Sequence, residues 1–249
     1  MTLTDLYEAS PLGAVSSFFY GTIQSALFTL LAVYATSMNF TILEISVVTF
    51  LLAISGAIAQ FPIGKLSDIY DRRKVIVIST FGAAIFAILA ILVSRQMYLP
   101  EGLATSKTWF YIFFILFSFC SLPMFSLILA HTNDNISKEK FVAAGAGLQF
   151  IFGLGAMSGP FLCSIFMDLV GSNGFFVFLF FFHAVIGFFG IYRMTVRKTV
   201  ENPDSQFVAM PQTITPAGIE LNPTTEPIEE PEKNYIENFI IFNLFIAFR

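Results

Sequence analysis

Charged residues cluster between positions 60 and 76, where they could pair across the ends of two helices. Five residues keep a fixed spacing there: Gly64, Leu66, Asp68, Arg72 and Arg73. A glycine lets two backbones approach closely, and a carboxylate can face the positive N-terminus of a neighbouring helix. Because Arg72 follows Asp68 by one helical turn, its guanidinium can hold that carboxylate. We name these five residues the latch motif. Uncharged apolar runs too long for a soluble core stand on both sides of it, so we predict that it closes the cytoplasmic mouth of a membrane protein.

A simpler interpretation of the same residues stays open. Lys65, Arg72, Arg73 and Lys74 are four cations in one short connection, and cations of this kind mark the cytoplasmic side of a membrane protein without any further role. The basic residues alone do not decide between a latch and a topology signal.

Polar side chains also occur inside long apolar runs. Tyr20 and Gln24 lie one helical turn apart within a charge-free run from residue 9 to residue 43. Polar groups at membrane depth are costly unless they face a partner or water. The pair therefore either lines a solute cavity or hydrogen-bonds a neighbouring helix, and the sequence leaves both interpretations open.

Small residues indicate where helices pack closely. Gly13, Ser17, Gly21 and Ser25 repeat at a strict spacing of four, which allows backbone-to-backbone packing in lipid. A second set lies in the apolar run 141–167, where Gly155, Gly159 and Pro160 predict close packing and a bend.

The composition places the chain in a membrane. Of its 249 residues 56% are hydrophobic, 32 are Phe and only 12% are charged, whereas soluble domains have about 25% charged residues. The net charge of −4 argues against a nucleic-acid partner. The sequence has no HExxH motif and no Cys/His spacing typical of zinc, so we expect neither an enzyme nor a metal or cofactor site.

Six apolar stretches are long enough to cross a bilayer, which takes about 20 helical residues. The sequence therefore predicts an all-α membrane protein, a six-transmembrane-helix bundle. Short connections between the stretches make consecutive helices antiparallel. The expected spans are 11–36, 43–64, 75–94, 108–130, 141–167 and 172–192.

The distribution of Lys and Arg predicts the orientation. Connections on one side hold nine Lys and Arg residues and those on the other side hold two. Since cytoplasmic loops carry the excess of cations, both ends of the six-helix unit are expected in the cytoplasm. The span 172–192 carries many Phe side chains and one ionisable residue, His183. We expect it to face lipid, with His183 interfacial or paired.

The rest of the chain divides by composition. Residues 1–10 form a predicted cytoplasmic N-terminal segment and 11–193 the membrane unit. Residues 194–238 are acidic and Pro-rich and predict a disordered cytoplasmic tail. The apolar segment 239–249 is too short to span, because ten helical residues reach only about 15 Å.

The latch motif resembles the loop signature G-x-L-[SA]-D-R-x-G-R-[RK] of the major facilitator superfamily. Two positions differ: Ile69 stands where the family usually has Arg, and Asp71 where it usually has Gly. The resemblance implies one six-helix half of a twelve-helix transporter. It also implies that the first and fourth helices line a central cavity, which adds Ser118 and Ser121 to Tyr20 and Gln24 and places Gln149 on the flank. In the family the partner of the motif's Asp would be a helix start in the other half.

The resemblance leaves the position of this half open. The absence of orienting cations before the first span, the Pro-rich tail and a likeness to bacterial efflux-like members favour the C-terminal half. In the alternative, the chain is an N-terminal half, with 194–238 as the central loop and 239–249 as the start of a seventh helix.

Transport is the expected function. The resemblance implies a secondary active transporter in the bacterial inner membrane, driven by an ion gradient and moving a small solute, with a second half or a second copy as partner. The alternative from another class is a membrane scaffold or assembly protein, or a truncated gene product, without transport.

Overall fold

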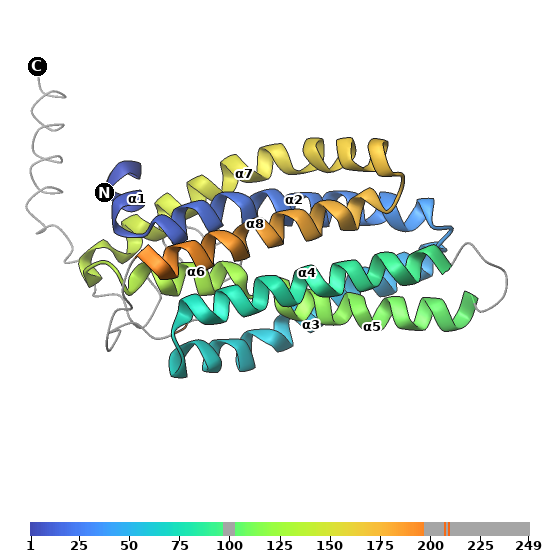
Figure 1. Ribbon diagram of the computed structural model, residues 1–249, viewed down its shortest axis with the longest axis horizontal. Helices are drawn as coiled ribbons and strands as arrows, with labels where there is room; N and C mark the ends of the chain where they lie inside the picture. The colour runs from blue at the N-terminus through green and yellow to red at the C-terminus, as the bar shows by residue number, and fades with distance from the viewer. Residues whose placement is uncertain (97–102, 197–206, 208, 210–249) are drawn as a thin grey trace, which may run out of the picture.

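The computed structural model describes residues 1–96 and 103–196, together with Phe207 and Ala209. Over these residues the chain is all-α and forms the expected bundle, with the long helices running side by side (Figure 1). Its elements are α1 (Leu3–Ala9), α2 (Pro11–Ser37), α3 (Ile42–Ile69), α4 (Arg72–Gln96), α5 (Leu103–Ser121), α6 (Met124–Asn133), the 3₁₀ turn η1 (Lys138–Lys140), α7 (Phe141–Val170) and α8 (Gly174–Val196).

Six helical units among the described residues are long and apolar enough to cross a membrane. They are α2, α3, α4, the pair α5 and α6 taken together, η1 with α7, and α8. Each coincides with one predicted span, so the six-helix prediction is confirmed. The predicted tail 194–238 and segment 239–249 lie outside the described residues, apart from the last residues of α8, Phe207 and Ala209.

Side chains before the helices fix where they begin. Thr41 and Glu44 form a capping box at the start of α3, and Ser10 caps α2 ahead of Pro11. The short helix α1 was not predicted from the sequence, yet it begins with the same device, since the backbone N–H of Thr2 donates to Asp5 over 2.8 Å. A Thr followed three residues later by an acid was the available signal.

The fourth span is broken in its middle. The helix α5 ends at Ser121 and α6 begins at Met124, with Pro123 between them. Pro123 has no N–H to continue the hydrogen-bond ladder, so the helix breaks at this point. The hydroxyl of Tyr20 on α2 donates to the carbonyl oxygen of Leu122 at this break over 3.1 Å.

Small residues bring the middle parts of α2 and α7 close together. The hydroxyl of Ser17 donates to the carbonyl oxygen of Leu148 over 2.8 Å. A Cβ atom on Gly21 would collide with the backbone of Phe152. These contacts are possible because the α2 residues at them, Ser17 and Gly21, are small.

The helix α8 does not face lipid with most of its aromatic side chains, so that expectation was wrong. Phe175, Phe176, Phe178 and Phe182 are buried. Phe175 and Phe176 pack against the ring of Tyr34 with centroid separations of 5.2 and 5.0 Å. The helix is packed against α2, α4 and α7, and its inward rings fill the space between them, while Phe181 and Phe188 are exposed.

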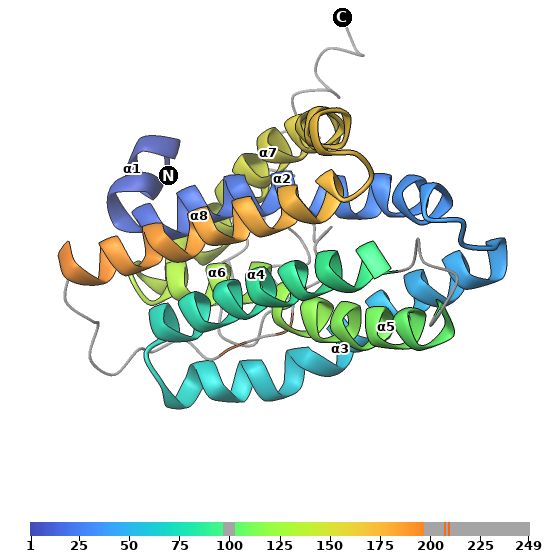
Figure 2. The same ribbon diagram turned by 45° about the vertical axis from the view of Figure 1, so that its right-hand side comes forward.

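The antiparallel order collects several chain segments at one end of the bundle. The helix α1, the turn between α3 and α4, the end of α6 and the C-terminal end of α8 lie at this end (Figures 1 and 2). It carries the connections with the excess of cations, so we call it the predicted cytoplasmic end.

Candidate functional site

The latch motif lies mostly on helices rather than in a loop. Gly64, Leu66 and Asp68 belong to the last turns of α3, and Arg72 and Arg73 open α4. The short connection expected between the spans 43–64 and 75–94 is shorter still in the structure, because α3 continues past Pro62 to Ile69 and α4 begins at Arg72. Only positions 70 and 71 separate the two helices, which holds the motif's side chains in a fixed register.

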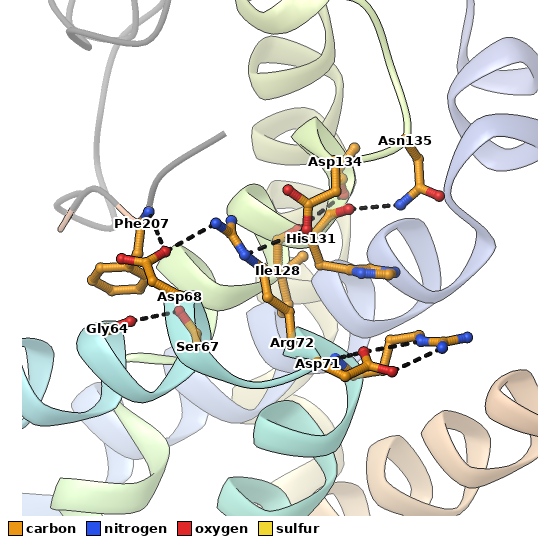
Figure 3. A network of polar contacts seen from close by, with 12 residues as sticks. Gly64, Ser67, Asp68, Asp71, Arg72, Ile128, His131, Asp134, Asn135 and Phe207 are labelled. Atoms are coloured by element: carbon orange, nitrogen blue, oxygen red, sulfur yellow. Dashed lines mark hydrogen bonds and ion pairs between the residues drawn. The ribbon is translucent and has the colours of Figure 1, made fainter. Parts of the chain in front are cut away.

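Arg72 joins the ends of three helices. Its terminal nitrogen lies 3.0 Å from Oδ1 of Asp68 on α3, and its Nε lies 3.3 Å from Oδ2 of Asp134 at the end of α6 (Figure 3). The side chains of Arg72 and Asp134 are 3% and 7% exposed, whereas that of Asp68 is 39% exposed. A buried guanidinium is tolerated when carboxylates pair with it. Arg72 therefore stays inside the bundle and Asp68 faces outward.

Arg73 forms a separate pair within the turn. Its guanidinium donates to both oxygens of Asp71, over 3.1 and 2.8 Å. Asp71 also accepts the backbone N–H of Arg73 over 3.0 Å, as an N-cap side chain does at a helix start. The residue that departs from the family signature at position 71 thus caps α4 and fixes Arg73.

Gly64 lies under an aromatic ring from the C-terminal segment. A Cβ atom at this position would collide with the ring of Phe207, while Leu66 is exposed. The backbone N–H of Phe207 donates to Oδ1 of Asp68 over 2.8 Å (Figure 3). Sequence reasoning missed Phe207, because it lies in a segment without apolar periodicity.

Two predicted cavity residues on α2 are buried between helices. Tyr20 donates to Leu122, as described above, and Gln24 is 3% exposed. On α7, Gln149 is half-buried. Tyr20 thus makes the hydrogen bond to a neighbouring segment that was the alternative to cavity lining.

The two predicted serines on α5 also bond neighbouring helices. Ser118 donates to the carbonyl oxygen of Leu52 on α3 over 2.7 Å. Ser121 lies 2.9 Å from Nε2 of His183 on α8. Nδ1 of His183 lies 2.7 Å from the carbonyl oxygen of Leu179, which can only accept. In the neutral ring Nδ1 therefore carries the proton and Nε2 accepts from Ser121.

Gly155 and Gly159 lie on the face of α7 that meets α2. A Cβ atom on Gly155 would collide with the carbonyl oxygen of Phe18, and one on Gly159 with that of Thr22. The hydroxyl of Thr22 donates back to the carbonyl oxygen of Gly155 over 3.1 Å. Pro160 follows within the continuous helix α7.

A further ion pair lies at the opposite end of the bundle. Nζ of Lys107 on α5 is 2.6 Å from Oε1 of Glu44 on α3 and 5.0 Å from the centroid of the Phe40 ring. No spacing in the sequence pairs Lys107 with Glu44, since they lie on different spans. The same holds for Arg72 and Asp134.

The comparisons with known proteins agree with this architecture. A family model described as Major Facilitator Superfamily matches residues 13–248. An uncharacterised MFS-type transporter of Yersinia enterocolitica is 25% identical over 203 residues, which cover 82% of this chain and 48% of the relative. The uncharacterised MFS-type transporter YfkF of Bacillus subtilis is 27% identical over 181 residues, covering 70% and 42%.

The chain spans about half the length of the curated relatives it matches. Six membrane helices, the latch motif at the turn between the second and third spans, and a family match over nearly the whole chain point to one assignment. The chain belongs to the Major Facilitator Superfamily.

Proposed function

We propose that the chain is one six-helix half of a secondary active transporter that moves a small solute across a bacterial inner membrane, driven by an ion gradient. Family membership and relatives named as bacterial transporters support this proposal. The observation that carries it is the position of Arg72, whose buried guanidinium joins α3, α4 and α6 at the predicted cytoplasmic end.

The charge pairs divide the latch into an inner and an outer part. Alternating access requires each six-helix bundle to move as a body around a site near the membrane midplane. The buried pair of Arg72 and Asp134 holds helix ends of one bundle together. Asp68, which is half-exposed, is the group that can meet a helix start of the second half or of a second copy. Opening the cytoplasmic mouth then breaks the contact of Asp68 and leaves the inner pair intact.

Among the predicted cavity residues, Gln24 on α2 and Gln149 on α7 are proposed to line this half's side of the cavity. The hydrogen bonds of Tyr20, Ser118 and Ser121 set the relative positions of the helices that carry them. In the described spans Asp and Glu lie near helix ends. A coupling carboxylate at mid-membrane would therefore come from the second half.

The two possible positions of this half lead to different partners. The C-terminal position stays our sequence-based prediction and requires a preceding six-helix unit. The family match continues to residue 248, and this supports the alternative in which residues 239–249 begin a further membrane helix.

A vesicle flux assay tests the proposal. The protein is reconstituted into sealed vesicles loaded with amino acids, sugars, nucleosides and organic cations, a proton gradient is imposed, and the loss of each solute is followed by mass spectrometry. We expect at least one solute to leave faster than from protein-free vesicles, with a slower rate for Asp68→Asn and an unchanged rate for Asp168→Asn, an exposed acid at the other end of the bundle. Rates equal to those of protein-free vesicles would favour the non-transporting scaffold, and an unchanged Asp68→Asn rate would contradict the latch.

A further inference from the structure

The outer face of α3 at the predicted cytoplasmic end is already occupied in this structure. Gly64 and Asp68 lie one helical turn apart and therefore share one face of α3. Gly64 is buried although Lys65 and Leu66 beside it are exposed. The three atoms nearest to a Cβ built on Gly64 all belong to the ring of Phe207. The ring thus covers the glycine.

Phe207 also donates a hydrogen bond to the carboxylate of Asp68, one helical turn further along α3. The backbone N–H of Phe207 donates to Oδ1 of Asp68 over 2.8 Å, the oxygen that also accepts from Arg72 (Figure 3). A hydrogen bond to an ionised carboxylate is stronger than one between neutral groups. The ring of Phe207 is packed against the hydrophobic core of the bundle. One residue therefore makes an apolar and a charge-assisted contact at once.

We propose that the Gly64–Asp68 face of α3 is a docking surface for Phe207 of the same chain. Two contacts recognise Phe207: its ring packs on Gly64, which has no side chain, and its backbone N–H donates to the carboxylate of Asp68. A side chain larger than Gly at position 64 would exclude the ring, and loss of the carboxylate at position 68 would remove the acceptor.

Docking has a consequence that rests on the proposed function. Phe207 binds Asp68, the outward-facing residue that the proposed transporter uses to contact its second half. Both contacts cannot use the same face of α3 at once. Phe207 therefore competes with the second half for Asp68, and its release from Asp68 precedes formation of the closed latch.

Photo-crosslinking tests the docking without any transport measurement. A p-azidophenylalanine replaces Phe207 in the full chain, which is reconstituted in lipid vesicles and irradiated. Mass spectrometry of the digested protein then locates the cross-link. We expect it in the peptide that contains Gly64. In Gly64→Leu the yield should fall by about tenfold, because the bulky side chain overpacks the place of the ring.

Gly153→Leu is the matched control, since a Cβ on Gly153 has no atom within 4 Å. This variant should keep the cross-link of the unsubstituted protein. Equal elution volumes in gel filtration and equal helical circular dichroism show that both variants are folded. A cross-link that maps outside residues 60–72 in the otherwise unsubstituted chain overturns the docking surface, whatever the folding of Gly64→Leu. So does a yield that Gly64→Leu leaves unchanged. A retained cross-link in a protein without solute flux would reject the proposed transport and leave the docking in place.

Discussion

Nε of Arg72 lies 3.3 Å from Oδ2 of Asp134, which joins the start of α4 to the end of α6. The i, i+4 spacing of Asp68 and Arg72 predicts only the contact between α3 and α4. The second carboxylate turns a local pair into a link between three helix ends. Because the side chains of Arg72 and Asp134 are almost fully buried, loss of this pair should lower the stability of the bundle.

Asp134→Asn should lower the stability of the bundle by about 1–3 kcal/mol, because it leaves a buried guanidinium with one carboxylate instead of two. The measurement is the apparent Tm in detergent, followed by circular dichroism. The same substitution at the exposed Asp168 is the control and should leave the Tm unchanged. Equal Tm values for the two variants would show that the pair of Arg72 and Asp134 does not stabilise the bundle.

Gly155→Ala should separate α2 from α7, since the added Cβ meets the carbonyl oxygen of Phe18. Overpacking of this kind costs about 1–3 kcal/mol. Gly153→Ala is the control, because its Cβ meets open space and Ala favours the helix. Thermal unfolding of both variants in the same detergent checks the prediction, and a Gly155→Ala variant as stable as Gly153→Ala would contradict the close packing.

Ser121→Ala should leave the buried Nε2 of His183 without its donor, at a cost of about 1–3 kcal/mol. The control is Ser164→Ala, whose hydroxyl bonds the carbonyl oxygen of Phe161 on its own helix. Chemical denaturation in mixed micelles gives the difference in unfolding free energy. No difference between the two variants would mean that the hydrogen bond adds nothing to the contact of α5 with α8.

Glu44→Gln removes the ion pair with Lys107 but keeps the cap of α3, because Gln can still accept the capping hydrogen bond. Both side chains are partly exposed, at 26% and 21%, so the loss should be at most about 1 kcal/mol. Screening should make it vanish near 1 M salt, where the Debye length is about 3 Å. Unfolding at low and high salt measures this, and a loss that persists at high salt would indicate that the cap rather than the charge was damaged.

The membrane spans could be predicted because a bilayer sets their length and polarity. The runs 11–36 and 141–167 are apolar and long enough to cross a bilayer. The helices α2 and α7 extend only a few residues beyond them. Pro123 marked the break in the fourth span for a chemical reason, the missing N–H. The glycine and serine spacing of α2 likewise indicated a packing seam, although it did not name α7 as the partner.

The environment of α8 could not be predicted from hydropathy. Lipid chains and a helical core are equally apolar, so the Phe residues of 172–192 fit both, and only the packing of α8 against α2, α4 and α7 places Phe175 and Phe176 inside. For the same reason no sequence spacing joined Arg72 to Asp134 or Asp68 to Phe207. Those contacts depend on which helix ends the fold brings together.

Labelling from each side of the membrane tests most directly the topology on which the proposed mechanism depends. In a chain with Cys120 and Cys163 replaced by Ala, single cysteines are placed at the exposed positions Lys65, Lys140 and Asp168. They are treated with a membrane-impermeant maleimide in right-side-out and inside-out vesicles. We predict that positions 65 and 140 react only in inside-out vesicles and position 168 only in right-side-out vesicles. Reaction of positions 65 and 140 from opposite sides would contradict the six-helix arrangement and the transporter proposed from it.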